Sequence, residues 1–227
     1  MDLILERDLE HQKKAVKAVA DVLDGVMMAS PAAAYQNPTF DCHHSRIPAN
    51  IKRIQWSKIR EENKHNPNPD KGDHLTIDVK METGTGKTYV YTQTMFELHK
   101  RFGFNKFIIA VPSLSIKAGT KQFLEDSYVR HHFADECGYN CQIELGVLES
   151  PKAKKKGFLA MPAPVRDFVS GSCRNTNRIY VLLTNMQLLT NGNMLTRSDY
   201  DYLVEGFYRP FDALKATKPV VIIDEPH

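Results

Sequence analysis

The sequence predicts an α/β fold in which a parallel sheet is covered by helices on both faces. Apolar segments of strand length alternate along the chain with segments of helix length, which is typical of a sheet buried on both sides. Two polar motifs stand where predicted strands end, which is where parallel sheets bind ligands. The chain has 227 residues, of which 42% are hydrophobic and 25% charged, so it is long enough to bury a core as one domain.

The predicted elements follow in chain order, within three parts. Residues 1–29 form an amphipathic helix with Asp8 as its candidate N-cap. Residues 30–73 are rich in proline and indicate an insertion of loop with a short helix at about 51–62. The core, residues 74–227, begins with a strand over 75–81, where apolar and polar residues alternate. It continues with helices at about 87–102 and 116–128 and strands at 106–111, 141–148, 179–184 and 220–223.

A turn rich in glycine and threonine lies between the strand predicted at 75–81 and the next helix. It reads Met-Glu-Thr-Gly-Thr-Gly-Lys-Thr over residues 81–88. The glycines let successive N–H groups point at phosphate oxygens, and the start of the helix adds the positive end of its dipole. Lys87 would reach the β- and γ-phosphates, and the Thr88 hydroxyl would bind Mg²⁺. The predicted phosphate-binding residues are Thr83, Gly84, Thr85, Gly86, Lys87 and Thr88.

An acidic pair follows the most apolar predicted strand, at 220–223. Asp224 is predicted to hold Mg²⁺ through water, and Glu225 to orient and deprotonate the attacking water. Each motif also has a plain structural interpretation, a turn that binds nothing or an acidic first turn of a helix. Their occurrence in one chain favours a nucleotide hydrolase with Lys87, Asp224 and Glu225 as catalytic residues.

The motifs together resemble those of superfamily 2 helicases and translocases. Residues 224–227, Asp-Glu-Pro-His, are similar to the acidic box of the DEAD/DEAH type, although Met81 stands where the general phosphate-loop pattern has glycine. Segments 107–113 and 183–187 resemble motifs that contact a nucleic-acid backbone. More narrowly, segments 81–91 and 216–226 resemble the Res subunit of type III restriction enzymes.

This resemblance implies a RecA-like P-loop NTPase lobe that uses ATP and Mg²⁺. It implies the ATP-binding lobe of a DNA-dependent translocase and endonuclease that acts on double-stranded DNA with a methyltransferase (modification) subunit. Gln12 falls where such proteins carry a glutamine that reads adenine. In the alternative interpretation, it is a polar residue on a helix surface. The resemblance implies that the nucleic-acid backbone is contacted by Pro112, Ser113, Thr184 and Asn185. In the alternative interpretation, these residues only cap the ends of strands.

The chain ends at His227, directly after the acidic pair. We therefore expect one lobe, truncated after its last strand, of a longer protein that also carries a second lobe and a nuclease domain. By itself this lobe is expected to hydrolyse ATP negligibly, because the second lobe supplies the arginines. Two alternatives stay open. One is the motor of another superfamily 2 protein, such as a type I restriction enzyme or an RNA helicase, and the other a nucleotide-dependent binding module without turnover.

Charge, cysteine content and hydropathy limit the partners, metal sites and locations that the sequence allows. The net charge is +3, and the lysines within 152–156 would either contact DNA or form a solvated loop. Four cysteines do not make a disulfide framework in a chain of this length, and neither Cys137 with Cys141 nor Cys42 with its neighbouring histidines makes a strong zinc motif. No stretch of about 18 apolar residues and no signal peptide is present, so we expect a cytoplasmic protein without a membrane partner.

Overall fold

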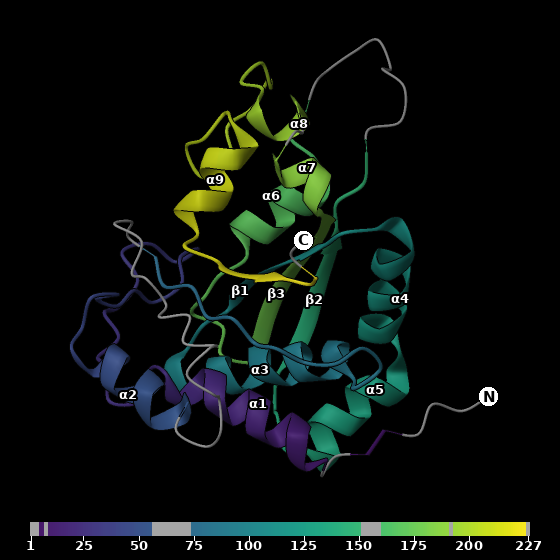
Figure 1. Cartoon of the computed structure of the whole chain (residues 1–227). Coiled ribbons are helices and arrows are strands. Elements are labelled where there is room, and N and C mark those ends of the chain that lie inside the picture. The colour runs from purple at the N-terminus through teal and green to yellow at the C-terminus, as the bar shows by residue number, and fades with distance from the viewer. Residues whose placement is uncertain (1–4, 7–8, 56–73, 151–159, 191–192, 226–227) are drawn as a thin grey trace. The chain divides into compact units, whose positions relative to one another are not determined.

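A computed structural model of the chain describes residues 5–6, 9–55, 74–150, 160–190 and 193–225 (Figure 1). The chain divides into two compact units. Unit 1 comprises residues 1–5, 31–38 and 103–227, and unit 2 comprises residues 6–30 and 39–102. The division at residues 30 and 73 that the sequence suggested stays a prediction.

Unit 1 is built on a parallel sheet of four strands in the order β2-β3-β1-β4, of which β3 and β2 lie side by side in Figure 1. All six residues of the central strand β1 are buried, as expected for a strand covered on both faces. The predicted α/β fold with a parallel sheet is therefore confirmed. The strands are β1 (Lys106–Val111), β2 (Gln142–Val147), β3 (Arg178–Asn185) and β4 (Val220–Ile223).

Helices of unit 1 complete its core. Val165 and Phe168 of α6 and Leu214 of α9 pack with Ile108 and Leu182 of the central strands, while α4 contacts β1, β2 and β3. The helices are α4 (Leu114–Glu125), α5 (Ser127–His131), the π-helical turn η2 (His132–Glu136), α6 (Ala163–Ser170), α7 (Met186–Thr190), α8 (Asn193–Thr196) and α9 (Pro210–Ala216).

The helix predicted at 116–128 is two helices in the structure. Asp126 has an extended backbone, with ψ of 128°, and its carboxylate accepts hydrogen bonds from the amides of Tyr128 and Val129. Aspartate is a preferred N-cap residue, so Asp126 ends α4 and starts α5. The apolar periodicity continues through Asp126, so the sequence pattern did not reveal that one helix ends and another begins there.

Unit 2 holds three described helices. They are α1 (Glu10–Asp21), α2 (Arg46–Gln55) and α3 (Lys87–Phe102). Helices α1 and α3 pack together, and Arg101 donates to Asp21 over 2.8 Å. The predicted helix in the proline-rich part begins earlier than expected, at Arg46, while its predicted end lies outside the described residues. The predicted N-cap Asp8 is wrong, because α1 has Leu9 at its N-cap position, without a side-chain hydrogen bond.

The strand predicted over 75–81 is wrong. No described residue of this segment belongs to a strand, and the side chains of Ile77 and Val79 are 36% and 47% exposed. Alternation of apolar and polar residues predicts which side chains share a face. A strand also needs a hydrogen-bonded neighbour, and the described part of the chain provides none here.

One buried side chain ties residues 31–38 into unit 1. Asn37 is fully buried, and its Oδ1 accepts from the backbone amides of Asn105 and Lys106 at 2.7 and 2.9 Å. Its Nδ2 donates to the carbonyls of Lys106 and Lys218 at 2.9 and 3.1 Å. Asn37 therefore joins the starts of β1 and β4, which are neighbours in the sheet.

We predict that Asn37→Ala lowers the free energy of unfolding by about 4 kcal/mol, because it removes four hydrogen bonds and leaves buried backbone groups without partners. Chemical denaturation measures the loss. Asn175→Ala is the matched control, since Asn175 accepts one bond from the amide of Asn177 in an exposed turn, and it should cost less than about 1 kcal/mol. Equal losses in the two variants would contradict the assigned role.

Candidate functional site

The backbone of the glycine-rich loop in unit 2 forms a tight turn that leads into α3. Gly84 and Gly86 have φ of +80° and +83°, which side chains other than glycine rarely adopt. The Thr85 hydroxyl donates to the Glu82 carbonyl over 2.7 Å, and the amide of Val90 donates to the Gly86 carbonyl over 3.0 Å. The loop therefore has the left-handed glycines on which the sequence prediction depended.

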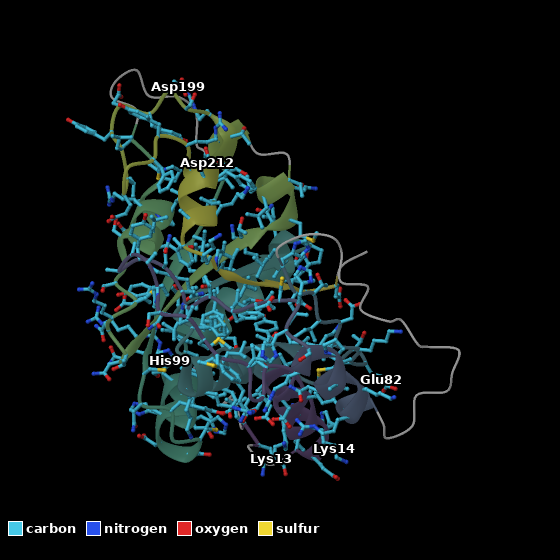
Figure 2. All side chains as sticks on the ribbon, turned by 90° about the vertical axis from the view of Figure 1, so that its left-hand side faces the viewer. Lys13, Lys14, Glu82, His99, Asp199 and Asp212 are labelled. Atoms are coloured by element: carbon cyan, nitrogen blue, oxygen red, sulfur yellow. The ribbon has the colours of Figure 1, made fainter. Side chains whose placement is uncertain are left out.

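Gln12 of α1 lies directly against this loop. Its side chain is almost completely buried, and Nε2 donates to the Thr85 carbonyl over 3.0 Å. Its Oε1 is buried and has no hydrogen-bond partner among the described residues. Such an acceptor is costly to leave unpaired, so this atom suits a ligand that carries a donor. Figure 2 shows the next two residues, Lys13 and Lys14, on the outer side of the helix.

His11 also contacts the glycine-rich loop, which the sequence prediction missed. Its Nε2 lies 3.2 Å from the same Thr85 carbonyl oxygen that accepts from Gln12. No local signal marks His11, because the contact arises from the packing of α1 against α3. The Thr85 carbonyl therefore meets two side chains of the N-terminal helix.

We predict that Gly86→Ala is more harmful than Gly84→Ala, although both strain a backbone with positive φ. A Cβ at Gly86 would lie 2.5 Å from Gln12 Nε2, whereas one at Gly84 meets nothing within 4 Å. Gly86→Ala should therefore displace the Gln12 amide and cost about 1 kcal/mol more, the value of one hydrogen bond. Denaturation of both variants measures this difference. In a Gln12→Ala background the difference should vanish, and a difference that persists there would contradict the explanation.

Lys87 and Thr88 occupy the first turn of α3, where both are partly buried. Thr83 lies in the turn and is exposed. A lysine amine, a hydroxyl and an open turn of backbone amides are the groups that bind phosphate and Mg²⁺ in such loops. The residues present in unit 2 therefore fit the nucleotide that the sequence implied.

The acidic pair ends the β4 strand in unit 1. The Asp224 amide donates to the Ala110 carbonyl of β1 over 3.0 Å, so the pairing of the two strands continues to Asp224. Glu225 has φ of +51°. This conformation costs a non-glycine residue on the order of 1 kcal/mol, and such strain clusters at functional sites. Both carboxylates are partly buried at the carboxyl edge of the sheet.

The implied nucleic-acid residues lie at this same edge. Pro112 and Ser113 follow β1, and Val111 pairs with Asn185 at the end of β3. Ser113 Oγ accepts from the Ile116 amide over 3.2 Å and so caps α4, which is the alternative interpretation of that residue.

Thr184 and Asn185 differ in the hydrogen bonding of their side chains. Thr184 is fully buried, and its hydroxyl donates weakly to the Asn185 carbonyl, over 3.3 Å. Asn185 Oδ1 is buried without a hydrogen-bond partner in the described part of the chain. Asn185 therefore offers a buried polar atom at the edge of the sheet that no described residue satisfies.

The described residues show neither a metal-binding cluster nor a membrane-spanning helix. Among these residues, no three His, Cys, Asp or Glu side chains gather as a metal site. No helix in the described ranges has the length and apolar character needed to cross a membrane. The lysines within 152–156 lie outside the described residues.

Comparison with known proteins places the chain in a family. The family model "Type III restriction enzyme, res subunit" matches residues 7–227, nearly the whole chain. The chain belongs to this family. The glycine-rich loop and the acidic pair both lie within the matched residues.

Three characterised Res subunits are similar to the chain over almost all of its length. That of the type III restriction-modification enzyme EcoPI of Escherichia phage P1 is 41% identical over 98% of this chain. One from Escherichia coli is 40% identical over 98%, and that of StyLTI of Salmonella typhimurium is 38% identical over 100%. The chain covers 23%, 23% and 20% of these relatives, respectively, so it spans about a quarter or less of their length.

Proposed function

We propose that the chain is the nucleotide-binding lobe of an ATP-dependent type III restriction enzyme. In the whole protein, ATP hydrolysis would drive movement or switching on double-stranded DNA, and a nuclease domain outside this chain would cut it. The modification subunit would choose the target. The family membership supports this function. The observation that carries it is the buried Oε1 of Gln12 beside the glycine-rich loop, which has no hydrogen-bond partner among the described residues. The proposal includes a cytoplasmic location, where a restriction enzyme would meet its DNA.

The loop residues 83–88 bind the phosphates in this proposal. The positive φ of Gly84 and Gly86 lets the backbone amides turn toward phosphate oxygens. Lys87 supplies the positive charge for the β- and γ-phosphates. Gln12 accepts a hydrogen bond from the adenine amino group at Oε1, while its Nε2 keeps its bond to the Thr85 carbonyl.

The carboxylates act on metal and water. Thr88 and Asp224 offer the hard oxygen atoms that Mg²⁺ prefers, and the ion would neutralise charge on the phosphates. Glu225 orients the attacking water and takes its proton. The strained backbone of Glu225, held where β4 ends beside β1, is consistent with a carboxylate fixed in one position.

The carboxyl edge of the unit 1 sheet contacts the DNA backbone in this proposal. Asn185 provides an amide oxygen that has no hydrogen-bond partner among the described residues and can accept from an ordered water, and its amide nitrogen can donate to a phosphate oxygen. Pro112 and Ser113 lie at the same edge. Contacts of this kind fix register without reading bases, which agrees with target choice by a partner subunit. Lysines within 152–156 would add salt dependence.

Base selectivity tests the nucleotide site. We predict that Gln12→Ala weakens binding of Mg·ADP about tenfold, because one specific hydrogen bond is lost. Binding of Mg·GDP should change less, since guanine has a carbonyl where adenine has the amino group. Calorimetry with both nucleotides measures the effect.

Gln93→Ala is the matched control for this test. Gln93 of α3 also has a buried side-chain oxygen without a described partner, and its replacement should leave the ADP to GDP ratio unchanged. Equal losses of ADP and GDP affinity in Gln12→Ala would mean that Gln12 supports the loop and does not read the base.

A further inference from the structure

The π-helical turn η2 of unit 1 brings a thiol, an imidazole and a carboxylate together. It continues α5, and the amide of Cys137 donates to the His132 carbonyl over 3.0 Å, which spans five residues. This wider turn places Cys137 back over His132. Such turns are rare, and they are frequent at functional sites.

The three side chains contact one another in series, with the imidazole in the middle. Cys137 Sγ lies 3.6 Å from His132 Nε2, and His132 Nδ1 lies 3.0 Å from Glu136 Oε2. The second contact has the distance of an ion pair but not the geometry of a hydrogen bond, so Glu136 acts on the ring through its charge. The imidazole is buried, Cys137 is partly exposed, and the Glu136 side chain is 48% exposed. A buried imidazole between a thiol and a carboxylate is the arrangement that activates a cysteine, because the ring takes the thiol proton and the carboxylate stabilises the resulting cation.

Two other cysteines of unit 1 have the opposite environment. Burial raises the pKa of the Cys141 thiol to about 11 and that of the Cys173 thiol to about 11, in the second case against a lowering by Lys106. Both therefore stay protonated near neutral pH and react slowly. Cys141 and Cys173 can therefore serve as internal references for the reactivity of Cys137.

We propose that Cys137 is a modification site for small, uncharged carbon electrophiles, with His132 as its base and Glu136 as the group that orients His132. The sulfur forms a bond to carbon, the leaving group departs with its electron pair, and the thiol proton passes to His132 Nε2. With iodoacetamide the products are a carbamidomethyl thioether and iodide. Because Cys137 precedes β2 and Asp224 follows β4, the site lies at the opposite edge of the parallel sheet from the acidic pair.

The test is alkylation of the folded protein by iodoacetamide near neutral pH, followed by mass spectrometry of each cysteine-containing peptide. Cys137 should react about tenfold or more faster than Cys141 and Cys173. Glu136→Gln should slow Cys137 several-fold and leave the other cysteines unchanged, and His132→Gln should remove its advantage. The Glu136 side chain is about half exposed, so Glu136→Gln remains informative if the His132 variant does not fold.

Two outcomes would overturn the proposal. One is a Cys137 rate no faster than that of Cys141 and Cys173. The other is a fast rate that Glu136→Gln leaves unchanged, which would show that exposure alone sets the reactivity. Alkylated protein should also bind Mg·ADP as before, so this result is separable from the function proposed for the loop.

Discussion

Lys87→Ala should abolish measurable nucleotide binding and, in the full-length protein, ATP hydrolysis. Lys87 stands in the first turn of α3, directly after the left-handed Gly86. A lysine there contributes a charge-assisted contact to the β- and γ-phosphates, worth about 1.5–3 kcal/mol, or roughly 10- to 150-fold in affinity. Calorimetry with Mg·ADP and a phosphate-release assay measure the two losses.

The control for this variant is Lys100→Ala, in the last turn of the same helix. It removes the same side chain from the opposite end of α3, away from the helix N-terminus that attracts anions. Affinity for Mg·ADP should not change there. If Lys87→Ala also binds Mg·ADP with unchanged affinity, the glycine-rich loop is not the nucleotide site.

Glu225→Gln should keep nucleotide binding and lose hydrolysis in the full-length protein. Glutamine matches glutamate in shape but does not take a proton from water, and a general base contributes about 10²–10⁴-fold to rate. Turnover should therefore fall by that factor while the affinity for Mg·ADP stays within about twofold, since the substitution is isosteric.

Glu205→Gln is a matched control, because Glu205 is also a glutamate with positive φ, 48° against 51° for Glu225. It lies in the turn between Val204 and Phe207, so the same chemical change at a similar backbone should leave turnover intact. Parallel loss of binding and hydrolysis in Glu225→Gln would assign Glu225 a structural role.

Local sequence determined most of the elements that carry the candidate site. The strands β1 and β3 were predictable because each is centred on a continuous apolar run, which is what a buried parallel strand requires. The apolar run of β4 also predicted a strand, although its residues alternate between partly buried and exposed. The glycine-rich loop and α3 were predictable for a different reason. Glycines that can adopt positive φ, followed by Lys87 and Thr88, prescribe a turn and a helix start from adjacent residues alone.

Tertiary structure decided the features whose cause lies far away in the chain. The segment 75–81 has the alternation of a strand, yet it lacks a hydrogen-bonded neighbour among the described residues. Asn37 lies in a proline-rich stretch and nevertheless bonds the backbone about 70 and 180 positions later. His11 and Gln12 reach the Thr85 carbonyl only because α1 packs on α3. Periodicity and residue type report neighbours along the chain, whereas hydrogen-bond partners of this kind are set by which surfaces the folded chain buries against each other.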